Sequence, residues 1–142
     1  MQKKDFIVRQ LEEFGKVMAV ILSFKKENDW DKFEKEIAEA AQKFTQLDVR
    51  RIESLDPPTF DHEILHHPDL ILDQKKILAD LLFEKMNFHL EKNDHMAYQH
   101  VRANCLALYT HIRANFTENE FDLNVYYKLE YLIQVSDERP EN

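Results

Sequence analysis

The stretch of this sequence most suggestive of chemistry is the segment 62–66, which reads H-E-I-L-H and matches the pattern His-Glu-x-x-His. On an α-helix this spacing places two imidazoles, here His62 and His66, on one face where they can bind zinc, and the intervening glutamate can activate a bound water. Catalytic zinc also needs a third protein ligand. Glu84 and His89 are the candidates, and either would have to approach through the tertiary fold.

The prolines on both sides of this motif argue against a zinc enzyme. Pro58 and Pro68 leave at most two helical turns between them, whereas tetrahedral zinc geometry needs a rigid and well-supported helix. We therefore expect a solvated polar connector, no cofactor, no bound metal and no catalytic residue. The alternative hypothesis is a metal-binding protein or metal-dependent hydrolase that uses His62, Glu63 and His66.

Three further groups could carry chemistry. His100 and His111 share a helix face, but the helical rise separates them by about 16 Å, which is too far for one metal ion. Cys105 lies at the centre of an apolar stripe, so we expect an unreactive core thiol. Asp80 interrupts an apolar run and must either reach solvent at a groove or have a partner; we expect the groove.

Composition narrows the class of function. The formal net charge is −8, and the basic residues form scattered pairs, so we expect no nucleic-acid binding. A single glycine excludes a glycine-rich phosphate loop, and no serine lies in a nucleophile elbow. The longest apolar run, 17–22, is too short to span a bilayer. One cysteine suits a reducing cytoplasm. We expect a cytoplasmic protein that is not an enzyme.

The same composition predicts an all-α fold. One glycine and four prolines in 142 residues are too few for the turns of a β-protein. We expect a single domain over residues 1–136 and a disordered tail over 137–142. Apolar residues recur at helical spacing, which predicts five main helices and one or two short ones in the connector 48–68. The main helices are expected over about 3–25, 29–47, 69–91, 94–112 and 117–133.

Capping residues mark several of the expected helix starts. Asn-Asp pairs at 28–29 and 93–94 precede two helices, Thr59 can cap a short connector helix, and Thr117 with Glu120 resembles a capping box for the last helix. The predicted core contains thirteen residues from the helical stripes: Leu11, Phe14, Met18, Trp30, Phe33, Ile37, Phe44, Leu78, Leu82, Val101, Cys105, Leu108 and Leu129.

The sequences F-K-K-E-N-D-W-D-K-F and H-L-E-K-N-D-H-M-A-Y, which begin at 24 and 89, describe the same event: a long helix, a tight polar turn and a second helix. Over 17–47 and 82–112 the chain resembles the tetratricopeptide-like family of stacked helical hairpins and is similar to uncharacterised short bacterial proteins of this type. Asn28 and Asn93 replace the family's turn glycine, and Phe33 and Tyr98 replace alanine.

This resemblance implies antiparallel helical hairpins, closed by a C-terminal capping helix, and a surface that binds a protein partner. With Asn28 and Asn93 aligned on the family's turn, the positions that resemble its ligand-facing ones are Lys25, Lys26, Asp80, Phe83 and Asn87.

Two hairpins are fewer than the three repeats that such stacks usually need, so the end faces must be covered. The last helix carries Tyr126, Tyr127 and Tyr131 beside its apolar stripe, and tyrosine is enriched at interfaces. We expect a symmetric homodimer through these residues; the alternative is that the connector 48–68 folds over the rings. The expected function is binding of a protein partner or of a second copy.

Overall fold

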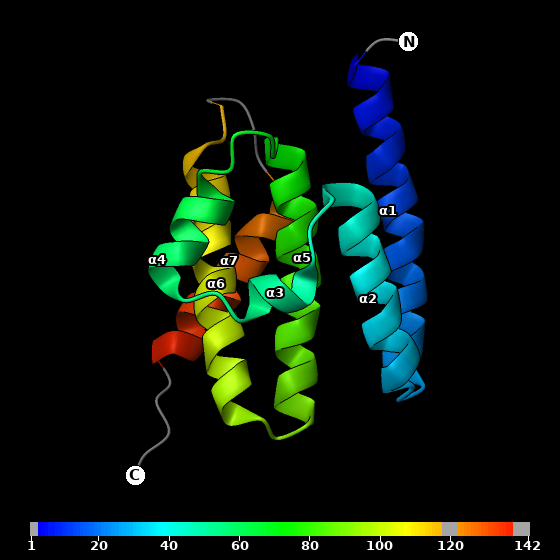
Figure 1. Cartoon of the computed structure of the whole chain (residues 1–142), viewed down its shortest axis with the longest axis vertical. Coiled ribbons are helices and arrows are strands. Elements are labelled where there is room, and N and C mark those ends of the chain that lie inside the picture. Colours follow the sequence, from blue (N-terminus) through cyan, green and yellow to red (C-terminus); the bar gives the residue numbers. More distant parts are fainter. Residues whose placement is uncertain (1–2, 118–121, 138–142) are drawn as a thin grey trace.

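The computed structural model describes residues 3–117 and 122–137, and these residues are helical throughout apart from short connections (Figure 1). This confirms the predicted all-α fold. The elements are α1 (Lys3–Lys26), α2 (Trp30–Thr45), α3 (Val49–Glu53), α4 (Pro57–Phe60), the π-helical turn η1 (Asp61–Leu65), α5 (Leu72–Glu91), α6 (His95–Ala114) and α7 (Leu123–Asp137). As predicted, five of the described helices are long, and the short ones lie in the connector.

The two Asn-Asp turns have the same backbone geometry. Asn28 and Asn93 both adopt positive φ, at 59° and 58°, the left-handed conformation that asparagine tolerates better than most residues. In the first turn the Asn28 N–H donates to Lys25 O and the Asp29 N–H donates to Phe24 O. Equivalent bonds form around Asn93. Asparagine therefore does here what glycine does in a Schellman motif, and it ends α1 and α5 in the same way.

The long helices pack in chain order. α1 lies against α2, α2 against α5, α5 against α6, and α6 against α7. Three-residue connections join α1 to α2 and α5 to α6, so the members of each pair run antiparallel (Figure 1). α1 is longer than α2, and its first turns extend beyond the end of α2 (Figure 1). α1 therefore forms one edge of the molecule.

Most of the predicted core is buried. Ten of the thirteen predicted residues lie in the buried cluster: Phe14, Phe33, Ile37, Phe44, Leu78, Leu82, Val101, Cys105, Leu108 and Leu129. Met18 and Trp30 are partly buried against it. Leu11 is 38% exposed, and the prediction that it belongs to the core is wrong. At about 100° per residue, it lies roughly 60° and 80° around the helix from the buried Phe14 and Ile21.

One predicted cap is wrong, and one long helix begins later than predicted. Asp56, not Thr59, caps α4: its Oδ1 accepts the Thr59 N–H at 3.0 Å, and Pro57 follows at the first helical position. α7 begins at Leu123, and Asp122 Oδ1 accepts the Val125 N–H at 3.2 Å, so this helix starts later than predicted.

Some predictions fall on residues that the structure does not describe. Glu120, the partner of Thr117 in the predicted capping box, lies outside the described residues. Of the predicted disordered tail, Asp137 belongs to α7, and 138–142 lie outside the described residues. No helix in the described part of the chain is both long enough and apolar enough to cross a membrane.

Candidate functional site

The His-Glu-x-x-His motif lies in the connector, at the end of a single short helix made of α4 and η1. The Phe60 N–H donates to Asp56 O, and the His66 N–H donates to Asp61 O, five residues back, which is the wider π spacing. His62 lies inside the π turn, whereas His66 ends it with φ −105° and ψ 22°. The regular α-helical frame that would present both imidazoles on one face is therefore absent from this segment.

The motif's glutamate and its second histidine have partners of their own. Glu63 forms an ion pair with Arg51 of α3. His66 donates from Nδ1 to Asp61 O at 3.0 Å, because a carbonyl can only accept. In the part of the chain that the structure describes, no group of three histidine, cysteine, aspartate or glutamate side chains is arranged to hold a metal ion. Neither Glu84 nor His89 therefore acts as the missing third ligand in this arrangement.

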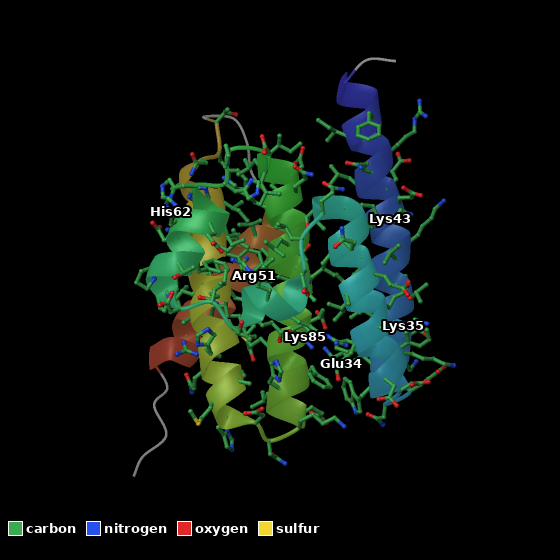
Figure 2. The ribbon with its side chains drawn as sticks, viewed as in Figure 1. Glu34, Lys35, Lys43, Arg51, His62 and Lys85 are labelled. Carbon is green, nitrogen blue, oxygen red and sulfur yellow. The ribbon has the colours of Figure 1, made fainter. Side chains whose placement is uncertain are left out.

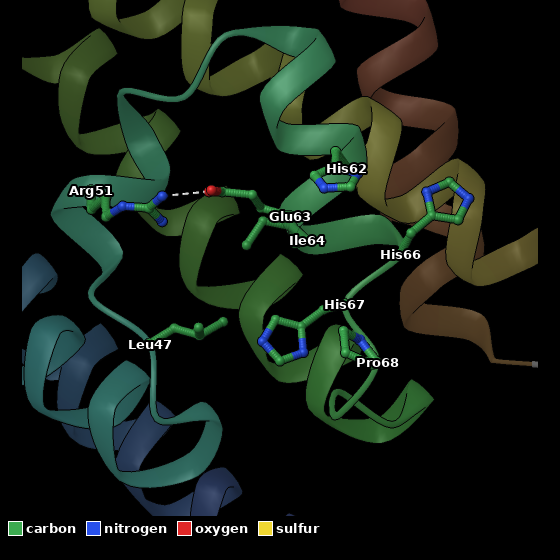
Figure 3. Close-up of a pocket in the computed structure, with 8 residues that line it drawn as sticks. All are labelled: Leu47, Arg51, His62, Glu63, Ile64, His66, His67 and Pro68. Atoms are coloured by element: carbon green, nitrogen blue, oxygen red, sulfur yellow. Dashed lines mark hydrogen bonds and ion pairs between the residues drawn. The ribbon is translucent and has the colours of Figure 1, made fainter.

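These side chains line an open pocket of about 390 Å³ between α3 and η1 (Figure 3). His67 closes one side of it, and its Nδ1 accepts the Asp69 N–H at 3.1 Å. A backbone N–H can only donate, so neutral His67 carries its proton on Nε2. On the opposite side of the pocket, the charge of Arg51 is matched by Glu63.

His111 anchors the other end of the connector. Lys75 Nζ donates to Leu65 O at 2.9 Å and contacts His111 Nε2 at 3.1 Å, so Nε2 of neutral His111 accepts from the ammonium group. Burial, the nearby Lys75 charge and His66 together lower the pKa of His111 below its ordinary value. Burial also lowers the pKa of Lys75. Burial and the neighbouring Lys75 charge therefore favour the neutral form of His111 at the end of the connector.

The five residues predicted to face a partner lie in two places. Asp80, Phe83 and Asn87 follow one another at helical spacing on one face of α5, and all three are half-buried. Lys25 Nζ bonds Glu84 of that helix at 3.0 Å. Lys26 is exposed. That this face binds a partner stays a prediction.

Asp80 is tied to neighbouring helices, so the alternative holds: it has partners, and the expectation that it reaches solvent at a groove is wrong. Its carboxylate accepts the Tyr109 hydroxyl of α6 at 2.6 Å, the Asn124 amide at 3.1 Å and Lys128 Nζ of α7 at 3.0 Å. The Asp80 side chain is only 18% exposed. Burial, together with the charge of Asp80 and the hydrogen bond to it, raises the pKa of Tyr109 well above its ordinary value. These contacts form a polar lock that holds α7 on α5 and α6.

Phe83 of α5 packs beneath α7. Its ring makes edge contacts with Tyr109 and Tyr131, with centroids 6.4 and 5.8 Å apart, and Lys128 lies 4.9 Å above it. Tyr131 is thus partly an internal residue, whereas its neighbours on α7 point further outward. The connector, whose end is seated by Lys75, leaves all three predicted tyrosines exposed.

The outer face of α7 carries five exposed apolar or aromatic side chains, with the exposed Glu130 and Gln134 among them. Leu123, Tyr126, Tyr127, Tyr131 and Ile133 are each between 40 and 64% exposed. The opposite face of the helix buries Val125, Leu129 and Leu132 in the core. α7 therefore carries apolar side chains on both faces, and those on the outer face are exposed.

Sequence reasoning missed a charged network around a buried lysine. Lys85 of α5 is 5% exposed at its side chain, and its Nζ lies 3.2 Å from Glu34 of α2 and 3.5 Å from Glu53 of α3 (Figure 2). Glu53 also bonds His89 Nε2 at 2.6 Å. The available signal was Lys85 itself, a charged residue in the stripe of Leu78, Leu81 and Leu82. This network joins α2, α3 and α5 around the buried ammonium group of Lys85.

Cys105 is fully buried, as predicted, and burial raises the pKa of its thiol. His100, on the same helix, donates from Nε2 to Leu55 O at 2.6 Å, and the Asn104 amide donates to the same carbonyl at 3.2 Å. Both side chains hold the connector, and the half-buried His100 also lines an open pocket beside Met96 and Glu53. Among the described residues neither belongs to a group that could hold a metal ion.

No family model, no curated protein and no solved structure matches this chain.

Proposed function

We propose that this chain is a non-enzymatic helical protein of the reducing cytoplasm whose function is protein–protein interaction, and that its partner is a second copy of itself. The supporting observation is the outer face of α7. It gathers three tyrosines and two aliphatic side chains on a helix of 15 residues that is firmly attached to the rest of the fold. Exposed apolar patches with polar margins are typical of protein-binding surfaces.

The order of residues on this face suits a two-fold axis. The centre of the face carries four residues that recur at a spacing of three or four: Leu123, Tyr127, Glu130 and Gln134. Two α7 helices could pair antiparallel, with the two-fold axis passing at the height of Leu129 along the helix. This pairing would bring Tyr126 to the partner's Ile133. The same register would bring Tyr127 to the partner's Tyr131 and Glu130, where a phenol can donate to a carboxylate.

Tyr127 is the best site for a test, because it is 64% exposed and not part of the lock around Asp80. Changing Tyr127 to serine should weaken the dimer without destabilising the monomer. Light scattering coupled to size exclusion measures the mass. Met96→Ser is the matched control, since Met96 is 87% exposed on α6.

We expect the wild-type protein and Met96→Ser to self-associate at tens of micromolar and Tyr127→Ser to do so more weakly. A wild-type monomer at that concentration, or association that Tyr127→Ser leaves unchanged, would refute the proposal. Circular dichroism of each variant shows whether the fold is intact.

A further inference from the structure

The chain's only glycine occupies a place that the fold gives no reason for. Gly15 lies in the middle of α1, where glycine costs about 1 kcal/mol relative to alanine. Its φ is not positive, so its conformation does not need glycine. A Cβ at this position would meet nothing within 4 Å, so no neighbour in the same chain needs the space. Gly15 is also exposed.

Gly15 lies at the centre of an apolar stripe that α1 does not use for its own packing. Val8, Leu11 and Leu22 are exposed by 38 to 46% and lie on the same side of the helix as Gly15. α1 packs on α2 through a different side, which contains the buried Phe14 and Ile21. The exposed stripe lies on the helix at the molecule's edge (Figure 1).

We infer that this stripe binds the α1 helix of a second copy, antiparallel and crossing at Gly15. A missing Cβ lets two backbones approach closely, which gives the glycine a role that the single chain does not supply. The inference goes beyond the proposed pairing of α7, because it concerns another helix and a second contact.

The stripe is self-complementary about Gly15. Val8 and Leu22 lie seven residues on either side of it, so an antiparallel copy places Val8 beside the partner's Leu22. Leu11 then lies beside the partner's Met18.

The flanking charges fit the same arrangement. Glu12 and Lys16 lie together on one margin of the stripe, and both are exposed. In the antiparallel pair the two-fold axis runs perpendicular to both helices and passes between them. This margin of each copy therefore lies on the same side of the contact. Glu12 of each copy therefore faces the partner's Lys16, and the ion pair forms twice. A parallel two-fold pairing would place the two copies of this margin on opposite sides of the contact, so these ion pairs would not form.

A single helix crossing buries less than the roughly 1,200 Å² at which specific interfaces begin, so this contact should be weak alone. α1 and α7 lie on different parts of the fold, and both contacts can form together. We therefore expect assemblies larger than a dimer at high concentration, built from two different two-fold contacts.

The test uses the full chain carrying Tyr127→Ser, which removes the α7 contact and leaves the α1 contact to be measured by sedimentation. Gly15→Ala in this background should weaken the remaining association at least about tenfold, because its Cβ separates the backbones. The same change should raise the melting temperature by a few degrees, because alanine is the better helix former. A general loss of structure cannot produce these opposite effects.

Val20→Ala is the matched control, since Val20 is equally exposed on α1 but lies outside the stripe. It should leave association unchanged. Glu12→Lys and Lys16→Glu should each weaken association, and the two together should restore it.

Mixing Val8→Cys with Leu22→Cys should give a disulfide-linked dimer under mild oxidation, whereas Val8→Cys alone should not, because its two copies would lie about 21 Å apart. Cys105 is buried and does not interfere. A monomeric Tyr127→Ser protein would refute the α1 contact while leaving the α7 proposal intact. Association that Gly15→Ala does not change, or cross-linking of Val8→Cys with itself, would also refute it.

Discussion

Replacing Asp80 by alanine tests whether α7 is held by the polar lock. The substitution removes the acceptor of the Tyr109 hydroxyl, and Tyr109 is fully buried, so that hydroxyl is left without its partner. It also removes the carboxylate that Asn124 and Lys128 contact. Asp80→Ala should therefore reduce the free energy of unfolding and loosen α7 before the other helices.

The magnitude follows from the separate contacts. Leaving a buried hydroxyl without a hydrogen-bond partner lowers the free energy of unfolding by about 1 to 3 kcal/mol. The partly exposed ion pair with Lys128 contributes about 1 kcal/mol or less. Asp80→Ala should thus cost about 1 to 4 kcal/mol. Tyr109→Phe should cost only about 1 to 2 kcal/mol, because Asp80 keeps its other two partners. In the Asp80→Ala protein, Tyr109→Phe should be neutral or stabilising, since it removes the stranded hydroxyl.

Urea unfolding of both single variants and the double variant, followed by far-ultraviolet circular dichroism at low protein concentration, measures these differences. Glu39→Ala is the control, because Glu39 is an exposed carboxylate on α2. Hydrogen exchange should show the largest increase in α7. The reasoning is wrong if Asp80→Ala costs no more than Glu39→Ala, or if Tyr109→Phe destabilises the Asp80→Ala protein as much as it destabilises the wild type.

Four other outcomes are expected. Because the fold lowers the pKa of His111 below its ordinary 6.5, the unfolded chain takes up that proton first, so the free energy of unfolding should fall as pH drops from about 7 towards 5. His111→Gln should flatten this dependence in urea unfolding. Phe33→Ala should cost about 3 to 5 kcal/mol in the same assay, since Phe33 is fully buried. Cys105 should react with a thiol reagent only as the protein unfolds, and a fast reaction of the native protein would contradict its burial. Untagged protein should contain no stoichiometric zinc, iron or manganese, and His62→Ala should not change its stability; a metal lost in that variant would support the alternative of a metal site.

Local features were the most predictable from the sequence. The Asn-Asp pairs that begin at Asn28 and Asn93 form their turns and caps through hydrogen bonds to residues at most five positions away. Both partners of each hydrogen bond are therefore visible in a short stretch of sequence. Helical periodicity likewise identified Phe33 and Leu82 as core residues. Leu11 was misplaced because an apolar residue at the correct spacing does not reveal whether a neighbouring helix reaches that position.

Long-range partners were not predictable. Asp80 meets a hydroxyl 29 residues away and an ammonium group 48 residues away, and no local pattern connects them. The motif at His62 looked catalytic because the pattern assumes an α-helix, whereas Pro58 and the π turn change its frame. A spacing motif therefore predicts chemistry only when the backbone that carries it has the assumed geometry.

Gly15 shows how sequence and structure have to be combined. From composition, a single glycine indicated a helical chain without a glycine-rich phosphate loop. The structure adds that neither backbone conformation nor packing within the chain needs it. Since alanine would stabilise the helix by about 1 kcal/mol, a residue that weakens the monomer points to an interaction outside it. The same argument applies to the exposed tyrosines of α7, whose apolar surface also gains from being covered. Both features make self-association the simplest physical account of the surface.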